Sequence, residues 1–189
     1  MEYSGRAADM IYDQMIEGRY VRLRSINESD AQFSLDIRQD KEKTKYLHPV
    51  DNDINKQTAW IRKQMAAPGD YFFVAESADG DKVGTVGVYG IEKNVGHLGR
   101  LLMVGNPFQS FEATMLAMKF AYEVLGLDEL YGDVHVDNTA SIHISGAMGF
   151  HFKEPVYEEE LDRWVKYCTS YRSEFPEYES KIKQMIYRD

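Results

Sequence analysis

The alternation of apolar and polar residues along the chain predicts several short β-strands. Residues 20–24 alternate strictly, which is typical of a strand with one buried face. Two later β-rich runs flank Asp79–Gly80, a dipeptide typical of a tight hairpin turn. The predicted strands are 20–24, 71–76, 83–91, 98–104, 130–136, 152–157 and 164–169. The pattern therefore predicts a sheet of about seven strands.

Apolar positions three and four residues apart predict the helices between these strands. The predicted helices cover about 29–40, 53–67, 107–125, 139–148 and 177–187. Ser29 is the predicted cap of the first helix. In the third helix, Leu116, Phe120 and Val124 form a predicted buried face, and methionines extend the apolar surface onto its flanks. This helix is therefore expected inside a packed layer.

The order of these elements predicts one mixed α/β (α+β) domain across all 189 residues. Its core covers about 19–170, residues 1–18 form an N-terminal extension, and a C-terminal helix covers about 176–188. A chain of this length can bury a hydrophobic core of its own. Its apolar stretches are all shorter than the roughly 18 residues of a membrane-spanning helix, so a membrane is not an expected partner.

Charge and cysteine content narrow the function classes. The chain has 31 acidic and 22 basic residues, which argues against nucleic acid or an anionic membrane as a partner. Its single cysteine, Cys168, rules out an internal disulfide and a cysteine-based metal site. No metal is expected, and the reducing cytoplasm is the expected location. The aromatic content of 13% also allows a homodimer interface.

The segment after the strand at 130–136 carries the most specific motif. Asn138 precedes Thr-Ala-Ser-Ile at the start of a short helix, and Gly149–Phe150 ends that helix. This pattern resembles motif B of the GNAT N-acetyltransferases, in the form seen in enzymes that acetylate ribosomal-protein N-termini and small amines. The resemblance implies that Asn138 helps to bind the pantetheine arm of acetyl-CoA. The alternative is that Asn138 only caps the helix.

The order of elements over residues 19–170 also resembles the GNAT order. The resemblance implies the GNAT fold, a central, mostly antiparallel, twisted sheet flanked by helices. It further implies an N-acetyltransferase with acetyl-CoA as co-substrate and a small-molecule primary amine as acceptor. Asn106–Pro107–Phe108 and Gly99–Arg100–Leu101–Leu102 resemble the bacterial acetylases of surface aminosugars. A nucleotide-linked aminosugar is therefore one expected acceptor.

Residues 102–112 lie where GNAT enzymes bind the cofactor. The resemblance implies that the strand end contacts pantetheine and that the turn and helix start bind pyrophosphate, as helix N-termini bind anions. This chain departs from the family pattern, because Gly105 is the one glycine of the turn and Pro107 lacks an amide hydrogen. Asn106 and Gln109 also have the spacing of a capping box. The expected cofactor-binding residues are Leu102, Met103, Val104, Gly105, Asn106, Ser110, Phe111 and Asn138.

Acetyl transfer to an amine needs a base for the ammonium and an acid for the leaving thiolate. Asp133 and His135 share one face of a predicted strand, and the resemblance places Asp133 where a bacterial ribosomal-protein acetylase has a glutamate. They are the predicted base, with simple solvent exposure as the alternative. The family acid is often a tyrosine four residues before Gly-Phe. This chain has Ser145 there, so Ser145 and Ser141 are the candidate proton relays. Surface or capping roles are expected for His97, His143 and His151.

Basic residues mark the expected acceptor site. Arg100 and His48, with the lysines at 41, 43 and 45, are predicted to form a mouth that accepts an anionic group. The structural alternative is a solvated run of charges. Two other functions stay open: an N-terminal acetylase of a ribosomal or other protein, and a non-catalytic GNAT-like module that binds a ligand. The missing glycines and tyrosine favour the second of these.

Overall fold

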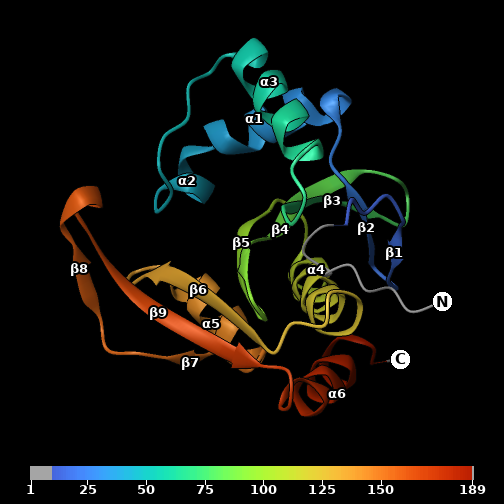
Figure 1. Cartoon of the computed structure of the whole chain (residues 1–189), viewed down its shortest axis with the longest axis vertical. Helices are drawn as coiled ribbons and strands as arrows, with labels where there is room; N and C mark the ends of the chain where they lie inside the picture. Colours follow the sequence, from blue (N-terminus) through green and yellow to red (C-terminus); the bar gives the residue numbers. More distant parts are fainter. Residues whose placement is uncertain (1–9, 189) are drawn as a thin grey trace.

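The computed structural model describes residues 10–188, which form a mixed α/β fold around one mostly antiparallel sheet (Figure 1). The fold class predicted from the sequence is thus confirmed. Residues 1–9 of the predicted N-terminal extension, and Asp189, lie outside the described part. The strands are β1 (Ile16–Glu17), β2 (Val21–Ser25), β3 (Tyr71–Ser77), β4 (Lys82–Glu92), β5 (Val95–Met103), β6 (Glu129–His135), β7 (His151–Phe152), β8 (Val156–Glu158) and β9 (Arg163–Tyr171).

The strand order is β1-β2-β3-β4-β5-β6-β9-β7, and β8 also pairs with β9. β5 and β6 run parallel, whereas the other pairs of the described sheet are antiparallel. The sheet exceeds the predicted strand number for two reasons. The two-residue β1 adds an edge strand, and Pro155 lies between β7 and β8, where one strand was predicted. Proline has no amide hydrogen for a ladder, which explains the interruption.

The helices are α1 (Ala31–Gln39), α2 (Lys41–Thr44), α3 (Ile54–Met65), α4 (Pro107–Lys119), α5 (Thr139–Ala147) and α6 (Phe175–Ile186). A 3-10 turn at Glu28–Asp30 precedes α1, and another lies at Glu159–Leu161. Asn27, rather than the predicted Ser29, caps the first of these turns through a capping box with Asp30. Within residues 10–188, none of the helices has both the length and the apolar character to span a membrane.

β3 is buried on both faces and so divides the core into two layers. Phe72 and Val74 pack on one face with Ile61 of α3 and Ala31 of α1. The alternate residue Phe73 packs on the other face, against Phe120 just after α4. Because side chains alternate across a strand, one apolar run serves both layers. Figure 1 shows α1 and α3 on one side of this part of the sheet, with α4 and α6 on the other.

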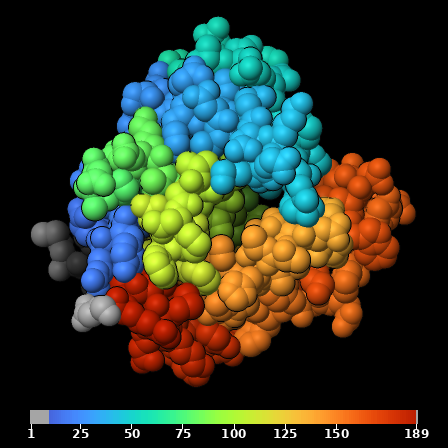
Figure 2. Space-filling view, turned by 180° about the vertical axis from the view of Figure 1, so that it is seen from behind, coloured from blue at the N-terminus to red at the C-terminus, as the bar shows by residue number. Residues whose placement is uncertain are grey.

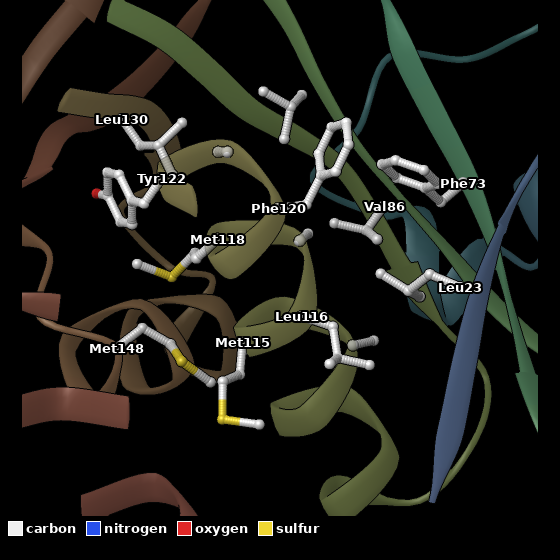
Figure 3. Packing of buried hydrophobic residues seen from close by; sticks show 14 of the residues in the cluster. Leu23, Phe73, Val86, Met115, Leu116, Met118, Phe120, Tyr122, Leu130 and Met148 are labelled. Carbon is white, nitrogen blue, oxygen red and sulfur yellow. The ribbon is translucent and has the colours of Figure 1, made fainter. Parts of the chain in front are cut away.

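α4 lies inside the larger layer, as its apolar flanks predict. Residues 110–118 are all buried, and Figure 3 shows Met115, Leu116 and Met118 among core side chains from the sheet and Met148, just after α5. A π turn at Phe120–Val124 continues α4. The wider spacing of a π turn rotates the later residues relative to an α-helix. Val124, predicted to be buried, is consequently 47% exposed.

The divergence of β5 and β6 positions the functional site. Their parallel ladder includes the pairs from Val95↔Glu129 to His97↔Tyr131 and then ends. β5 continues along β4 to Met103, while β6 continues along β9 to His135. The two strands therefore separate, and the backbone of residues 98–103 faces a cavity on the β6 side.

Candidate active site

Two cavities meet at the divergent part of β5. The larger, of about 550 Å³, lies between β5, β6, the beginning of α5 and the segment that leads from α2. The smaller, of about 430 Å³, lies between β5, α1 and α3. Both are lined by Leu47, Arg100, Leu101, Leu102 and Arg163. Figure 2 shows a hollow between the segment from α2 to α3, the beginning of α4, and α5. The two cavities thus adjoin at this part of β5.

The predicted site residues divide between the cavity walls and their surroundings. The larger cavity is lined by Leu102, Met103, Ser110, Asn138, Ser141, Ser145, Asp133 and His135. His48 lines the smaller cavity. Val104, Gly105 and Asn106 lie in the adjoining turn, outside the lining of both cavities, and Phe111 is buried in the core. The structure therefore brings most of the predicted residues to one region.

Asn138 caps α5 and also lines the larger cavity. Its side chain accepts a hydrogen bond from the Ser141 amide at 3.1 Å and caps α5. At the other end of α5, Gly149 has φ +86°, and the Phe150 amide donates to the Ser145 carbonyl at 3.0 Å. A left-handed residue after the last turn is a common helix ending. These two caps fix α5 so that its first turn faces the larger cavity.

The turn before α4 is internally hydrogen-bonded. The amides of Val104 and Gly105 both donate to the Val83 carbonyl, at 2.8 and 3.1 Å. The Asn106 amide donates to the Gln109 side chain at 2.9 Å, and the Gln109 amide donates to the Asn106 side chain at 3.0 Å. This is the capping box that the spacing indicates. Together with Pro107, it leaves few amides of the turn to bind a phosphate group.

Arg163 lines both cavities and is hydrogen-bonded to the carboxylate of Asp133. Its Nη2 donates to Asp133 Oδ2 at 2.9 Å, and its Nε donates to Glu158 Oε2 at 2.6 Å. The Tyr167 hydroxyl donates to the other oxygen of Glu158 at 2.5 Å. Hydrogen bonds from Tyr167 and Arg163 lower the pKa of Glu158, against the effect of burial. Arg163 of β9 thus holds Asp133 through its Oδ2, and Oδ1 is not part of this hydrogen bond.

Asp133 and His135 both line the larger cavity, and each has its own neighbours. His135 stacks on Tyr46, with ring centroids 4.8 Å apart, and its Nδ1 accepts a hydrogen bond from the Asp137 amide at 3.1 Å. His97, expected at the surface, is instead largely buried, and its Nε2 lies 3.6 Å from Asp133 Oδ1. Burial lowers the pKa of His97, Asp133 opposes this effect, and Arg100 adds to it. His143 and His151 are exposed, as expected.

Arg100 has a different environment from the predicted open mouth. Its backbone lies in the left-handed region, at φ +52°. Both Nη atoms donate to the Asp70 carboxylate, the second at 3.0 Å. Its guanidinium also lies 4.0 Å from the Tyr89 ring centroid and 5.2 Å from that of Phe72. The positive charge of Arg100 is thus compensated within the protein.

Cys168 lies in the wall of the larger cavity, but it is a weak nucleophile. Burial, and then the charge of Asp133, raise the pKa of its thiol to about 12. Its Sγ donates to the Gly132 carbonyl at 3.6 Å. Because the thiolate is the reactive form, this environment keeps the thiol unreactive. In the described part of the chain, His, Cys, Asp and Glu side chains also form no group of three or more that could hold a metal ion.

The sequence interpretation missed Arg163, Glu158 and Arg38 as site residues. The strand pairing contains a signal for the first of these. Asp133 pairs with Tyr167 in the antiparallel β6–β9 ladder, so Arg163, four residues before Tyr167, lies on the same face as Asp133. The register of this ladder is a tertiary property that the local pattern does not contain.

The sequence comparison decides the family. A profile of the acetyltransferase (GNAT) domain matches residues 21–151. The chain belongs to the GNAT acetyltransferase family. GNAT acetyltransferases use acetyl-CoA, so the predicted enzyme class and co-substrate are confirmed. No curated protein sequence matches the chain significantly.

Solved structures of other proteins share the fold. A GCN5-related N-acetyltransferase from Brucella melitensis is 19% identical, with a TM-score of 0.78 over 93% of this chain and 86% of that one. Apo FdhC, described as a nucleotide-linked sugar GNAT, is 21% identical, with a TM-score of 0.75 over 93% and 98%. Spermidine N-acetyltransferase from Vibrio cholerae, in complex with CoA and spermine, is 17% identical, with a TM-score of 0.76 over 84% and 99%. At these identities, the likeness concerns the fold alone.

Proposed function

We propose that this GNAT enzyme transfers the acetyl group of acetyl-CoA to the primary amine of a small molecule in the smaller cavity. The observation that supports the proposal is the junction of two cavities at β5, where Arg100, Leu101 and Leu102 line both. A thioester in the larger cavity and an amine in the smaller one would meet there. Holding two reactants together in this way removes much of the entropic barrier.

The larger cavity fits the pantetheine arm better than it fits the pyrophosphate of acetyl-CoA. The backbone of residues 98–103 faces this cavity and offers amide and carbonyl groups to an elongated, amide-containing arm. The turn at 104–109 fits a phosphate group less well, because its amides are already hydrogen-bonded. Acetyl-CoA, when bound, supplies an activated acetyl thioester. The proposed contacts are Leu102, Met103, Ser110 and Asn138.

Asp133 is the proposed base. It lines the larger cavity and accepts a hydrogen bond from Arg163, which lines both cavities. An ammonium nitrogen must lose a proton before it can attack a carbonyl, and Asp133 can take that proton directly or through water. His135 lines the same cavity and is the proposed second member of the relay. Ser141 and Ser145 are the proposed donors of a proton to the leaving group, through water.

The charges around the smaller cavity support an anionic acceptor. Its lining includes Arg38, His48, Arg100 and Arg163, but no Asp or Glu among the described residues. A polyamine would therefore meet positive rather than negative charge at its second nitrogen. A nucleotide-linked aminosugar has an amine together with anionic phosphates, and FdhC is described as a nucleotide-linked sugar GNAT. We propose an acceptor of this electrostatic type.

Two measurements test the proposal. Calorimetry should detect acetyl-CoA binding tighter than millimolar, which corresponds to more than about 4 kcal/mol. Release of free thiol from acetyl-CoA should then rank nucleotide aminosugars above spermidine and above peptides that begin with Ser or Ala. Binding no tighter than millimolar would support a non-catalytic module. Preferential acetylation of the peptides would support an N-terminal acetylase.

A further inference from the structure

Arg38 is a partly buried cation in the wall of the smaller cavity. Its Nη2 donates to the backbone carbonyl of His48. Among residues 10–188, no Asp or Glu side chain forms an ion pair with it, and burial lowers its pKa with no carboxylate to oppose the effect. The other two arginines of this cavity differ, because Arg100 is paired with Asp70 and Arg163 with Asp133. Arg38 is therefore the cation of this cavity that lacks a counter-charge.

An uncompensated guanidinium next to apolar surface is costly, because burial removes part of its hydration. A guanidinium has five N–H donors, and the His48 carbonyl accepts from one nitrogen of Arg38. Its planar fork matches the paired oxygens of a carboxylate or phosphate. An anionic group in this cavity would supply both the missing charge and the missing acceptors.

The remaining wall of the smaller cavity is largely apolar and aromatic. Trp60 and Phe72 meet edge to face, with ring centroids 5.5 Å apart. Leu47 and Leu101 line the side of the cavity that adjoins the larger one. Such a surface favours a flat or apolar body, since transfer of apolar area from water is favourable.

The positions of the charged residues separate the two ends of the acceptor. Arg38 lines the smaller cavity and is not part of the larger one, whereas Asp133 lines the larger cavity and is not part of the smaller one. Leu101 and Arg163 lie at the junction between them. An amine directed at the junction and an anion at Arg38 would thus lie at opposite ends of the same molecule.

We propose that Arg38 binds the anionic group of the acceptor, and that the acceptor is a primary amine on an apolar or aromatic body with a carboxylate or phosphate at its far end. This inference rests on the proposed function and specifies its substrate class. It moves the anion contact from Arg100, whose charge is compensated by Asp70, to Arg38.

The first test measures binding without acetyl transfer, so that it does not depend on the proposed function. The probes are para-ethylbenzoate, para-ethylphenyl phosphate and the neutral para-ethylbenzamide, none of which has an amine. In calorimetry, the wild type should bind the better of the two anions at least about 10-fold more tightly than the amide, as expected for charged hydrogen bonds. The anion that binds more tightly shows whether the cavity prefers a carboxylate or a phosphate. Equal affinity for all three probes would overturn the proposal, and this comparison needs no variant.

The second test uses Arg38→Gln with Arg62→Gln as a matched control. Arg62 lies on α3, is exposed and pairs with Glu28 at 2.7 Å, outside both cavities. Arg38→Gln should remove the preference for the anions, while Arg62→Gln should retain it. If Arg38 only supported the loop at His48, affinity for all three probes would fall together, and the proposal would be wrong.

The third test applies the same comparison to turnover. The corresponding amines are para-aminoethyl-benzoate, para-aminoethyl-phenyl phosphate and para-aminoethyl-benzamide. Arg38→Gln should lower kcat/KM for the preferred anionic amine at least about 10-fold, through KM, and leave the neutral amine nearly unchanged. Anion binding that depends on Arg38, without acetylation of any amine, would contradict the proposed function but support the Arg38 site. If Arg38→Gln acetylates the amines with the same preference for the anionic amine as the wild type, the result would support the proposed function but contradict the Arg38 site.

Discussion

At the scale of single residues, the proposed proton transfer depends on Asp133. Arg163 holds one of its oxygens at 2.9 Å, and the other lies 3.6 Å from His97. Asp133→Asn retains an acceptor for Arg163 but removes the basic oxygen. We expect kcat/KM to fall by roughly 10²-fold or more, the usual scale of general base catalysis. Steady-state kinetics, with calorimetry to show unchanged acetyl-CoA affinity, measures this effect.

Glu129→Gln is the matched control for this prediction. Glu129 lies at the other end of β6, outside both cavities, so its substitution should leave kcat/KM unchanged. Ser145→Ala should have a much smaller effect than Asp133→Asn, because water can replace a weak relay. Full activity in an Asp133→Asn, His135→Ala double variant would mean that proximity and carbonyl polarisation suffice without this base.

At the scale of elements, Asp30 connects the beginning of α1 to the sheet. Its buried carboxylate accepts hydrogen bonds from Arg24 of β2, at 2.7 and 2.8 Å, and pairs with Lys82 of β4 at 2.7 Å. Burial alone would raise the pKa of Asp30. The hydrogen bonds from Arg24, Lys82 and the Asn27 amide outweigh burial and lower this pKa to about 2.

The lowered pKa predicts how stability depends on pH. An unfolded aspartate has a pKa of about 3.9, so ionised Asp30 stabilises the fold above about pH 4, and this contribution disappears as the pH falls toward about 2. Asp30→Asn should lower the free energy of unfolding by about 3 kcal/mol at neutral pH, since it breaks a buried pair. In urea titrations, the difference in free energy of unfolding between Asp30→Asn and the wild type should become smaller at acid pH. A loss of stability that does not depend on pH, or that equals the loss in exposed Asp36→Asn, would contradict the stabilising role of ionised Asp30.

The end of α5 depends on a glycine for two separable reasons. Gly149 has φ +86°, and a Cβ atom there would lie 2.4 Å from the Tyr178 ring. Gly126 has φ +69° but has open space around its Cβ position. Gly126→Ala should therefore cost only the left-handed backbone penalty of about 1 kcal/mol. Gly149→Ala should cost about 2 kcal/mol more, because its Cβ would also clash with the Tyr178 ring. Denaturant titrations measure the loss of stability in both variants. Equal losses would mean that the Tyr178 ring moves freely to make room for the new Cβ.

At the scale of the whole molecule, the local pattern accounts for the elements better than for their pairing. The buried run of β3 and the apolar flanks of α4 are visible in the sequence, because burial on both faces leaves no polar alternation. The division of 152–157 into β7 and β8 depends on how each pairs with β9. The exposure of Val124 depends on a π turn that the apolar spacing does not indicate.

The same limit applies to the candidate site. Asp133 could be proposed because it lies five residues before Asn138 in a local motif. Arg163 lies 30 residues from Asp133 in the chain and reaches it through the β6–β9 register. Arg38 lies in a cavity that the packing of α1 and α3 against β5 creates. Composition suggested an anion contact, but only the tertiary pairing with Asp70 separates Arg100 from Arg38.

Glu112 connects the beginning of β2 and the residue after α6 to the central helix α4. Its carboxylate is fully buried and accepts hydrogen bonds from the amides of Arg19, Tyr20 and Val21 at 2.8, 2.6 and 2.7 Å. The Tyr187 hydroxyl, just after α6, also donates to it. One side chain of α4 thus holds the turn between β1 and β2 together with the end of α6. Four donors point at the two carboxylate oxygens of Glu112, so both of these positions must hold a hydrogen-bond acceptor.

Glu112→Gln should therefore destabilise the whole molecule. The glutamine NH₂ group would place a donor against backbone donors, and we expect the free energy of unfolding to fall by about 3 kcal/mol or more, the cost of leaving buried amides unpaired. Tyr187→Phe removes one donor and leaves the three amides paired, so its cost should be about 1 kcal/mol. Exposed Glu123→Gln, in the turn that continues α4, is the control and should have nearly no effect. Urea unfolding followed at two wavelengths measures all three variants. A larger loss for Tyr187→Phe than for Glu112→Gln would show that the hydroxyl, rather than the three amides, is what the carboxylate holds.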